Sequence, residues 1–381
     1  MAETKKTTTR RRSTAKKATN GQAAASQENF PDKAISLKST FNAYPAGKYT
    51  HEDVGLSADD VLAMYRNMLL QRRFEERAAQ MYGKQKIAGF LHLYIGQEAV
   101  STGTATAIEI GKDSVITAYR DHGHGLALGM SANECMAELF GKIDGCSRGK
   151  GGSMHYFSKE KGLFGGHGIV GAHVPLAVGI GFGHKYRETG GVSIGFYGDG
   201  AHGQGAVHEA TNLAGLYDLP VILAVENNQY AMGTAVHRAF SETEFTRWAV
   251  GYGLPSSLVN GMDVFAVTKA MQDHVAMARD FKPSFLEIRT YRYRGHSMSD
   301  PQKYRTKEEL EDKKNEDPII RLKAYLIEKK MSDADALDAI DEDVKEEVLA
   351  SVEFSENSPF PDLSTIYEDI YEEDDYPYIG R

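Results

Sequence analysis

The sequence contains little cysteine and no long apolar run. Its two cysteines, Cys135 and Cys146, are too few for a disulfide scaffold or for a zinc site built on cysteine ligands. No stretch approaches the roughly 18 consecutive apolar residues of a membrane-spanning helix, and no apolar segment follows the basic N-terminus as in a secretory signal. We therefore expect a soluble protein of a reducing, intracellular compartment, with no membrane partner.

The charge of the chain is unevenly distributed. The formal net charge is −9, but residues 1–20 carry seven Lys and Arg and one acid, a sum of +6, so the rest sums to −15 (−9 minus +6). Residues 1–20 hold no Leu, Ile, Val, Phe, Trp or Tyr, which predicts a disordered basic arm over residues 1–28. Acidic residues crowd among tyrosines at the other end and predict an acidic extension over 361–381. Residues 29–360 are expected to form one α/β domain with an N-terminal helical segment.

Four interpretations of the basic arm remain open: a nucleic-acid-binding arm, an organelle transit peptide, a docking tail for an acidic partner, and a solvated tail without a partner. A transit peptide should form an amphipathic helix, and this arm lacks the apolar face. The acidic body with its single Trp is unlike a nucleic-acid-binding domain. We expect no nucleic-acid partner, and we expect the bacterial cytoplasm rather than the mitochondrial matrix.

Glycine is concentrated in one part of the sequence. Of the 38 glycines, 20 fall between Gly141 and Gly205, and eight of the 13 histidines fall between His122 and His208. Glycine is used where the backbone approaches another group closely or adopts a positive φ. Apolar residues are interleaved with these glycines, unlike the composition of a flexible linker. This segment is therefore expected to be packed structure around a ligand.

Apolar strand-like runs alternate with segments of helical periodicity. The expected helices are 57–81, 169–186, 202–217 and 265–280, and the expected strands are 192–197, 219–225 and 284–290. Strands joined through helices by short connections predict an α/β fold, with a parallel sheet covered by helices on both faces. Ligands of such sheets bind at the carboxyl ends of the strands.

A glycine motif follows the first of these strands. Residues 198–203 (GDGAHG) match GxGxxG, and Glu226 ends the next strand where a dinucleotide-binding fold has its ribose-binding acid. Asp199 argues against that interpretation, because two like unit charges at ~4 Å repel by about 4 kcal/mol at an effective dielectric of ~20. A divalent cation between carboxylate and phosphate removes the conflict. Asn228 ends the next strand with another oxygen ligand, and such ligands favour Mg²⁺ or Ca²⁺ over zinc.

Gly198-Asp199-Gly200, followed after 26 residues by Asn227-Asn228, resembles the thiamin diphosphate motif. Further segments resemble the alpha chains of the two-chain, thiamin diphosphate-dependent 2-oxo acid dehydrogenases, namely 90–99, 117–123, 149–155, 165–175 and 291–301. The resemblance covers roughly residues 45–370, and it is greater to pyruvate dehydrogenase than to branched-chain or acetoin relatives. It implies a thiamin diphosphate-binding fold, of which this chain is the diphosphate-binding half.

The resemblance also implies site residues. Asp199, the side chain of Asn228 and the main-chain carbonyl of Tyr230 are expected to bind Mg²⁺. The residues expected to bind thiamin diphosphate are Tyr119, Arg120, Gly168, Val170, Asp199, Gly200, Ala201, Asn228, Arg292 and His296. The residues expected to be catalytic are His92, His122 and His296.

Thiamin catalysis needs a carboxylate against the pyrimidine ring, and the sequence holds no second α/β domain to supply it. In the two-chain family a beta chain supplies it, so we expect an alpha2-beta2 heterotetramer that is active only when assembled. The implied reaction is oxidative decarboxylation of pyruvate and reductive acetylation of the lipoyl group of a dihydrolipoyl acetyltransferase core, feeding acetyl-CoA formation. The alternatives are an NAD-dependent oxidoreductase and a non-catalytic scaffold subunit carrying the basic arm.

Overall fold

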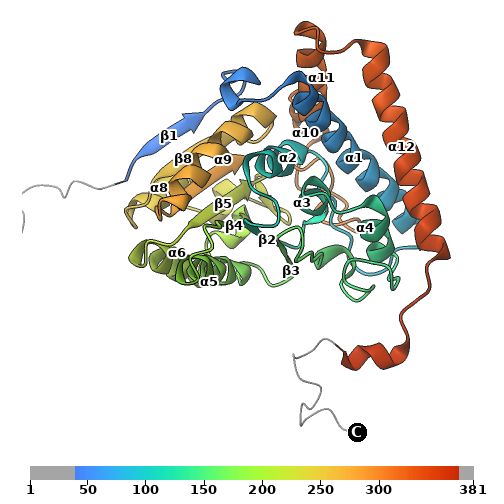
Figure 1. Cartoon of the computed structure of the whole chain (residues 1–381), viewed down its shortest axis with the longest axis horizontal. Helices are drawn as coiled ribbons and strands as arrows, with labels where there is room; N and C mark the ends of the chain where they lie inside the picture. The colour runs from blue at the N-terminus through green and yellow to red at the C-terminus, as the bar shows by residue number, and fades with distance from the viewer. Residues whose placement is uncertain (1–38, 369–381) are drawn as a thin grey trace, which may run out of the picture. The chain divides into compact units, whose positions relative to one another are not determined.

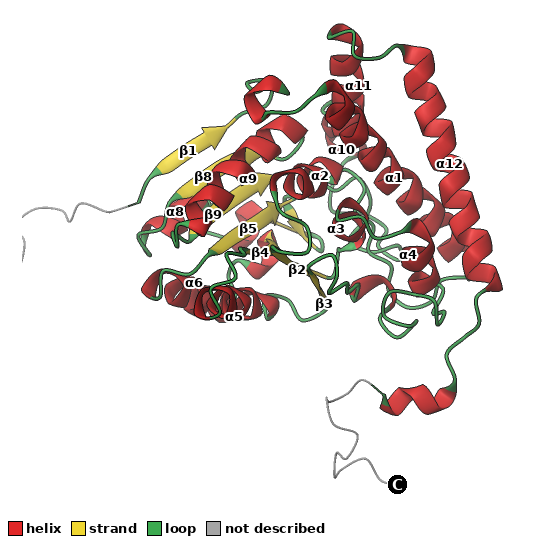
Figure 2. Cartoon of the chain, viewed as in Figure 1, coloured by secondary structure: helices red, strands yellow, loops and turns green. Residues whose placement is uncertain are grey.

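A computed structural model describes residues 39–368, in which seven strands form one parallel sheet (Figure 2). The strand order is β1-β8-β9-β5-β4-β2-β3. The strands of the sheet are β1 (Phe41–Tyr44), β2 (Ser114–Ala118), β3 (Leu163–His167), β4 (Ser193–Gly198), β5 (Val221–Asn227), β8 (Ser256–Asn260) and β9 (Ser284–Arg289). β6 (Tyr230–Ala231) and β7 (Thr234–Ala235) form a separate antiparallel hairpin. The expected α/β class and parallel sheet are confirmed.

Helices cover both faces of the sheet (Figure 1). They are α1 (Ala58–Gly83), α2 (Glu98–Ala107), α3 (His122–Ala127), α4 (Ala132–Leu139), α5 (His173–Tyr186), α6 (Gly205–Leu216), α7 (Val236–Ala239), α8 (Thr246–Val250), α9 (Val264–Arg279), α10 (Lys307–Lys314), α11 (Pro318–Glu328) and α12 (Ala334–Asn357). Short 3₁₀ turns are η1 (Glu52–Val54), η2 (Gly152–Met154), η3 (Asp199–Ala201) and η4 (Leu363–Tyr367).

The central strand β5 shows how the two layers divide the core. Its residues Val221, Leu223 and Val225 belong to a cluster with α5, α6 and α8, whereas Ile222 and Ala224 belong to the larger cluster formed with α1, α2 and α9. Successive side chains of a strand point to opposite faces, so a strand buried on both faces reads as a continuous apolar run. This is why β5 was identifiable from the sequence.

Several boundaries differ from the expected ones. The helix expected over 169–186 begins at His173, because the turn before it includes Gly171 with a φ of +79°. One side of this helix faces solvent, since Leu176, Phe182 and Tyr186 are exposed. The helix expected over 202–217 begins at Gly205, because η3 turns the chain directly after β4.

The C-terminal helices α11 and α12 pack against α1. α12 runs along α1 and α4 (Figure 1), and Arg73 of α1 donates two hydrogen bonds of 2.7 Å to Asp341 of α12. The basic arm expected over 1–28 and residues 369–381 of the expected acidic extension lie outside the described residues. Within residues 39–368, no helix is both long and apolar enough to span a membrane.

Candidate functional site

A cavity of about 220 Å³ lies where the carboxyl ends of β2, β4 and β5 meet. Register brings its residues together: Gly198 of β4 pairs with Glu226 of β5, so Asp199 and Asn228 follow side by side. The expected site residues that line the cavity are Tyr119, Arg120, Val170, Asp199, Gly200, Ala201, Asn228, Tyr230 and Arg292. Gly168, His92, His122 and His296 do not line it.

Asp199 presents an unused carboxylate oxygen. Its Oδ1 accepts a 2.7 Å hydrogen bond from the backbone N–H of Gly200, while Oδ2 is buried and has no hydrogen-bond partner among the described residues. Burial raises the pKa of Asp199 to about 6. Gly200 allows the turn to lie against the β6 strand, because a Cβ there would stand 2.5 Å from the Cβ of Ala231. The carboxylate is thus held in place by one oxygen, and the other is free of hydrogen bonds from the described residues.

The other two expected metal ligands contact a cationic group. Nη1 of Arg292 donates to Oδ1 of Asn228 at 3.3 Å and to the carbonyl oxygen of Tyr230 at 3.0 Å. One guanidinium nitrogen therefore bonds both oxygens that the sequence assigns to Mg²⁺. Because these oxygens already converge on positive charge, the residues present fit a divalent cation.

The cavity also carries positive charge without matching carboxylates. Arg120 is 7% exposed and donates only to the carbonyl oxygens of Leu93 and His296, at 2.7 and 2.8 Å. Arg292 is 1% exposed and bonds carbonyl, amide and phenol oxygens. Within residues 39–368 neither forms an ion pair with a carboxylate. Burial, together with the charge of Arg292, lowers the pKa of Arg120 to about 10. Buried charges are normally paired, so this arrangement fits an anionic ligand such as a diphosphate.

Two of the expected catalytic histidines lie together beside the cavity. The ring centroid of His92 is 4.7 Å from that of Tyr119 and 5.1 Å from that of His296, and Tyr119 itself lines the cavity. Burial and the charge of Arg120 lower the pKa of His92 to about 2 and that of His296 to about 4. Both rings are therefore neutral near pH 7, and Nδ1 of His92 is buried without a partner among the described residues.

His122 lies deeper, and protein groups occupy both of its ring nitrogens. Nδ1 is 3.1 Å from both carboxylate oxygens of Glu75, and Nε2 is 3.0 Å from the hydroxyl and carbonyl oxygens of Ser153. The Ser153 hydroxyl in turn accepts the backbone N–H of His92 at 3.0 Å. This placement argues against direct contact between His122 and a substrate.

Gln97 is a polar residue of the cavity that the sequence did not identify. Gln97 is fully buried, accepts a 3.0 Å hydrogen bond from Nδ2 of Asn228, and has no partner for its own Nε2 among the described residues. Its position in segment 90–99 carried no spacing signal that would have identified it. Glu226 lines the cavity, but its Oε1 accepts the hydroxyl of Tyr94 and lies 3.1 Å from Nε2 of His124. It is therefore not the free acid that a ribose-binding site requires.

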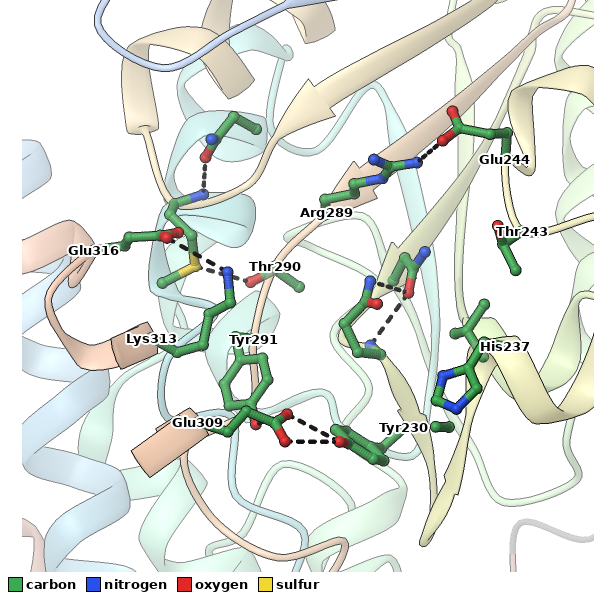
Figure 3. Close-up of a pocket in the computed structure, with 16 residues that line it drawn as sticks. Tyr230, His237, Thr243, Glu244, Arg289, Thr290, Tyr291, Glu309, Lys313 and Glu316 are labelled. Carbon is green, nitrogen blue, oxygen red and sulfur yellow. Dashed lines mark hydrogen bonds and ion pairs between the residues drawn. The ribbon is translucent and has the colours of Figure 1, made fainter. Parts of the chain in front are cut away.

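A larger cavity of about 550 Å³ lies between the ends of β5, β8 and β9 and the helix α10 (Figure 3). Tyr230 is the one expected site residue that lines it. Arg289 contacts Glu244 at 3.0 Å, Lys313 contacts Glu316 at 3.4 Å, and Glu309 accepts the neutral hydroxyl of Tyr230 (Figure 3). Among the described residues, both the Arg and the Lys that line this cavity thus have carboxylate partners, unlike Arg120 and Arg292 in the smaller cavity.

Comparison with known proteins places the chain in a family. Residues 66–364 match the family model described as dehydrogenase E1 component. The chain is 53% identical over 316 residues to the pyruvate dehydrogenase E1 component subunit alpha of Rhizobium meliloti, covering 82% of this chain and 90% of that protein. It is 50% identical to the protein of the same description from Zymomonas mobilis, covering 82% and 88%. It is 42% identical to the chloroplastic subunit alpha-3 of Arabidopsis thaliana, covering 83% and 75%.

Proposed function

Because the chain belongs to the dehydrogenase E1 component family, we infer that it is the alpha subunit of a pyruvate dehydrogenase. With a beta subunit it catalyses oxidative decarboxylation of pyruvate and reductive acetylation of the lipoyl group of dihydrolipoyl acetyltransferase, which feeds acetyl-CoA formation. One observation on the chain itself carries this inference: Arg120 and Arg292, two buried guanidinium groups without carboxylate partners among residues 39–368, line the same cavity as Oδ2 of Asp199, which has no partner there either. That arrangement suits a diphosphate bound with a divalent cation.

We propose that the cofactors are thiamin diphosphate and Mg²⁺. Asp199, the side chain of Asn228 and the carbonyl of Tyr230 would hold Mg²⁺, since all three offer the oxygen ligands that this ion prefers. The groups that would bind thiamin diphosphate are the side chains of Tyr119, Arg120, Arg292 and His296, the backbone N–H groups of Gly200 and Ala201, and the backbone of Gly168 and Val170. When bound, the cofactor supplies the carbanion chemistry that decarboxylation of a 2-oxo acid requires, and the protein orients it.

We propose that His92 and His296 are catalytic residues that contact the 2-oxo acid or the cofactor. Their lowered pKa values mean that each ring offers a neutral hydrogen-bond donor and acceptor near pH 7. His122 is better described as a positioning residue than as a catalytic one. Its contact with Ser153, whose hydroxyl accepts the backbone N–H of His92, supports this role.

The carboxylate that must contact the pyrimidine ring is proposed to come from a beta chain. Glu226 is the other carboxylate in the cavity, but Tyr94 and His124 already engage it. We therefore propose an alpha2-beta2 heterotetramer, bound to an acetyltransferase core, whose active site lies between chains. Pyruvate decarboxylation by the purified chain, free of beta chain, would overturn this proposal.

The cofactor proposal is tested by calorimetry on the assembled alpha–beta enzyme. We expect thiamin diphosphate binding that requires Mg²⁺ and is lost in Asp199→Ala. The control is Asp280→Ala. Asp280 is an exposed carboxylate between the end of α9 and the start of β9, so it lies at the amino ends of the strands and away from the cavity. Binding of NAD that is indifferent to EDTA would instead support an oxidoreductase. Binding of neither cofactor would support a scaffold subunit.

The regions around the domain carry further proposals. We propose residues 1–28 as a basic arm, 29–360 as the cofactor-binding domain and 361–381 as an acidic extension. We also propose the bacterial cytoplasm as the location, which the similarity to proteins of Rhizobium meliloti and Zymomonas mobilis supports. If deletion of residues 1–28 leaves co-purification with the acetyltransferase core unchanged, the interpretation of the basic arm as a docking tail is wrong.

A further inference from the structure

The side-chain amide of Asn228 can serve a metal ion in only one orientation. An amide presents an oxygen, which can bind a cation, and an NH₂ group, which repels one. The two ends have nearly the same shape, so shape alone does not select between them. Selection has to come from the hydrogen-bond partners of the amide.

Those partners are a donor on one side and an acceptor on the other. Nη1 of Arg292 can only donate, so it requires the oxygen of Asn228 on its side. Nδ2 of Asn228 then faces Gln97, whose Oε1 accepts at 3.0 Å. If the Asn228 amide were reversed, its NH₂ group would face the guanidinium, and two donors would oppose each other. A metal ion also requires Oδ1 of Asn228 on its side, as the guanidinium does, and Gln97 then accepts the hydrogen bond from Nδ2.

Gln97 stands on a fixed stretch of backbone. It is the residue before α2, where its carbonyl accepts the backbone N–H of Val100 at 2.9 Å. The preceding Gly96 has a φ of +102°, and a Cβ there would lie 2.3 Å from the carbonyl oxygen of Tyr291. The following Glu98 is held by Arg72 through bonds of 2.5 and 3.1 Å. The side chain of Gln97 thus starts from a position that cannot shift easily, and it is fully buried.

We propose that Gln97 is a positioning residue for the metal: by holding Nδ2 of Asn228 it turns Oδ1 toward Mg²⁺. This inference rests on the proposed cofactor site. It adds a residue that does not itself bind the metal but acts with Arg292 to orient one of the ligands.

The test measures the Mg²⁺ concentration that supports thiamin diphosphate binding to the assembled alpha–beta enzyme, by calorimetry. Gln97→Met keeps the length of the side chain but removes the acceptor, and we expect about tenfold weaker Mg²⁺ binding, the scale of one buried hydrogen bond. Gln97→Glu keeps an acceptor oxygen and should remain within about threefold of the parent enzyme. Equal Mg²⁺ affinity in Gln97→Met and the parent would overturn the proposal.

A double-mutant cycle separates orientation from a general loss of structure. In Asn228→Asp either carboxylate oxygen can face the metal, so no orientation has to be selected. We therefore expect Gln97→Met to change Mg²⁺ affinity less than about threefold in that background. If the loss is as large as in the parent, Gln97 acts through folding and the proposal fails. If the parent enzyme itself shows no Mg²⁺-dependent binding, the proposed function fails first, so the two failures are distinguishable.

Discussion

Arg120 is a buried cation whose removal we expect to affect ligand binding more than stability. In the cofactor-free chain, Arg120→Met should cost no more than about 3 kcal/mol of unfolding free energy. In the assembled enzyme the same change should weaken thiamin diphosphate binding by roughly 10- to 100-fold, because charge-assisted hydrogen bonds are worth roughly 1.5–3 kcal/mol. The expected change in the free energy of unfolding is the sum of two opposing contributions.

The first contribution favours the variant. Burial and the charge of Arg292 lower the pKa of Arg120 from its ordinary value to about 10, which corresponds to about 3 kcal/mol against the charged form. A base with a folded-state pKa below its unfolded value destabilises the fold while it is protonated, hence at every pH below about 10. Methionine removes this penalty. The second contribution destabilises the variant. The carbonyl oxygens of Leu93 and His296 lose their hydrogen-bond donor, which costs roughly 1–3 kcal/mol for each.

Arg72 provides the matched comparison. It is also largely buried, but it pairs with Glu98 at 2.5 Å and with Asp317 at 2.9 Å. Arg72→Met leaves two buried carboxylates without their cation, and we expect a loss of roughly 3–5 kcal/mol. Urea unfolding of the full chain without cofactor at pH 7.5 measures both variants. If Arg120→Met is as destabilising as Arg72→Met, or if it leaves cofactor affinity unchanged, Arg120 is a structural group and the diphosphate assignment is refuted.

Two further predictions concern packing and pH. Gly200→Ala would place a Cβ 2.5 Å from that of Ala231, so we expect the free energy of unfolding to fall by about 1–3 kcal/mol and Mg²⁺-dependent cofactor binding to weaken. The control is Gly179→Ala, which has nothing within 4 Å of its Cβ and should be neutral or stabilising. Equal behaviour of the two variants in thermal unfolding and calorimetry would contradict the packing argument. Burial lowers the pKa of His274 from its ordinary value of 6.5 to about 4, so the stability of the parent chain should fall by up to about 3 kcal/mol as pH drops from 6.5 to 4. His274→Gln should reduce that slope in urea titrations. If the pH dependence of the unfolding free energy is the same in His274→Gln and the parent chain, His274 is not its source.

The elements that the sequence predicted are those with a strong local signal. The capping box of Ser57 and Asp60 begins α1 as expected, and β4, β5 and β9 lie within a residue or two of the apolar runs that predicted them. The strands β1, β2, β3 and β8 were not predicted. They are four or five residues long, and β3 contains two glycines, which weaken the strand signal. Their pairing in the sheet, which is a long-range property, makes them strands.

The candidate site divides in the same way. The residue types and the spacing from Asp199 to Asn228 are local facts, and together with the position of each residue at a strand end they indicated a cation and a phosphate at the carboxyl edge. The sequence could not show that Arg120 and Arg292 lack carboxylate partners, or that Gln97 bonds Asn228 across 131 positions of chain.

The sequence by itself thus determined the α/β class, the elements with a strong local signal and the family resemblance, and it indicated a class of ligand, because these depend on neighbouring residues and their order. The tertiary structure decided which buried charges are paired, which histidines lie beside the cavity and which groups hold the Asn228 amide. Those outcomes depend on desolvation and on partners brought together by folding. The resemblance implies a catalytic role for His122, whereas its buried contacts with Glu75 and Ser153 support the positioning role that we propose.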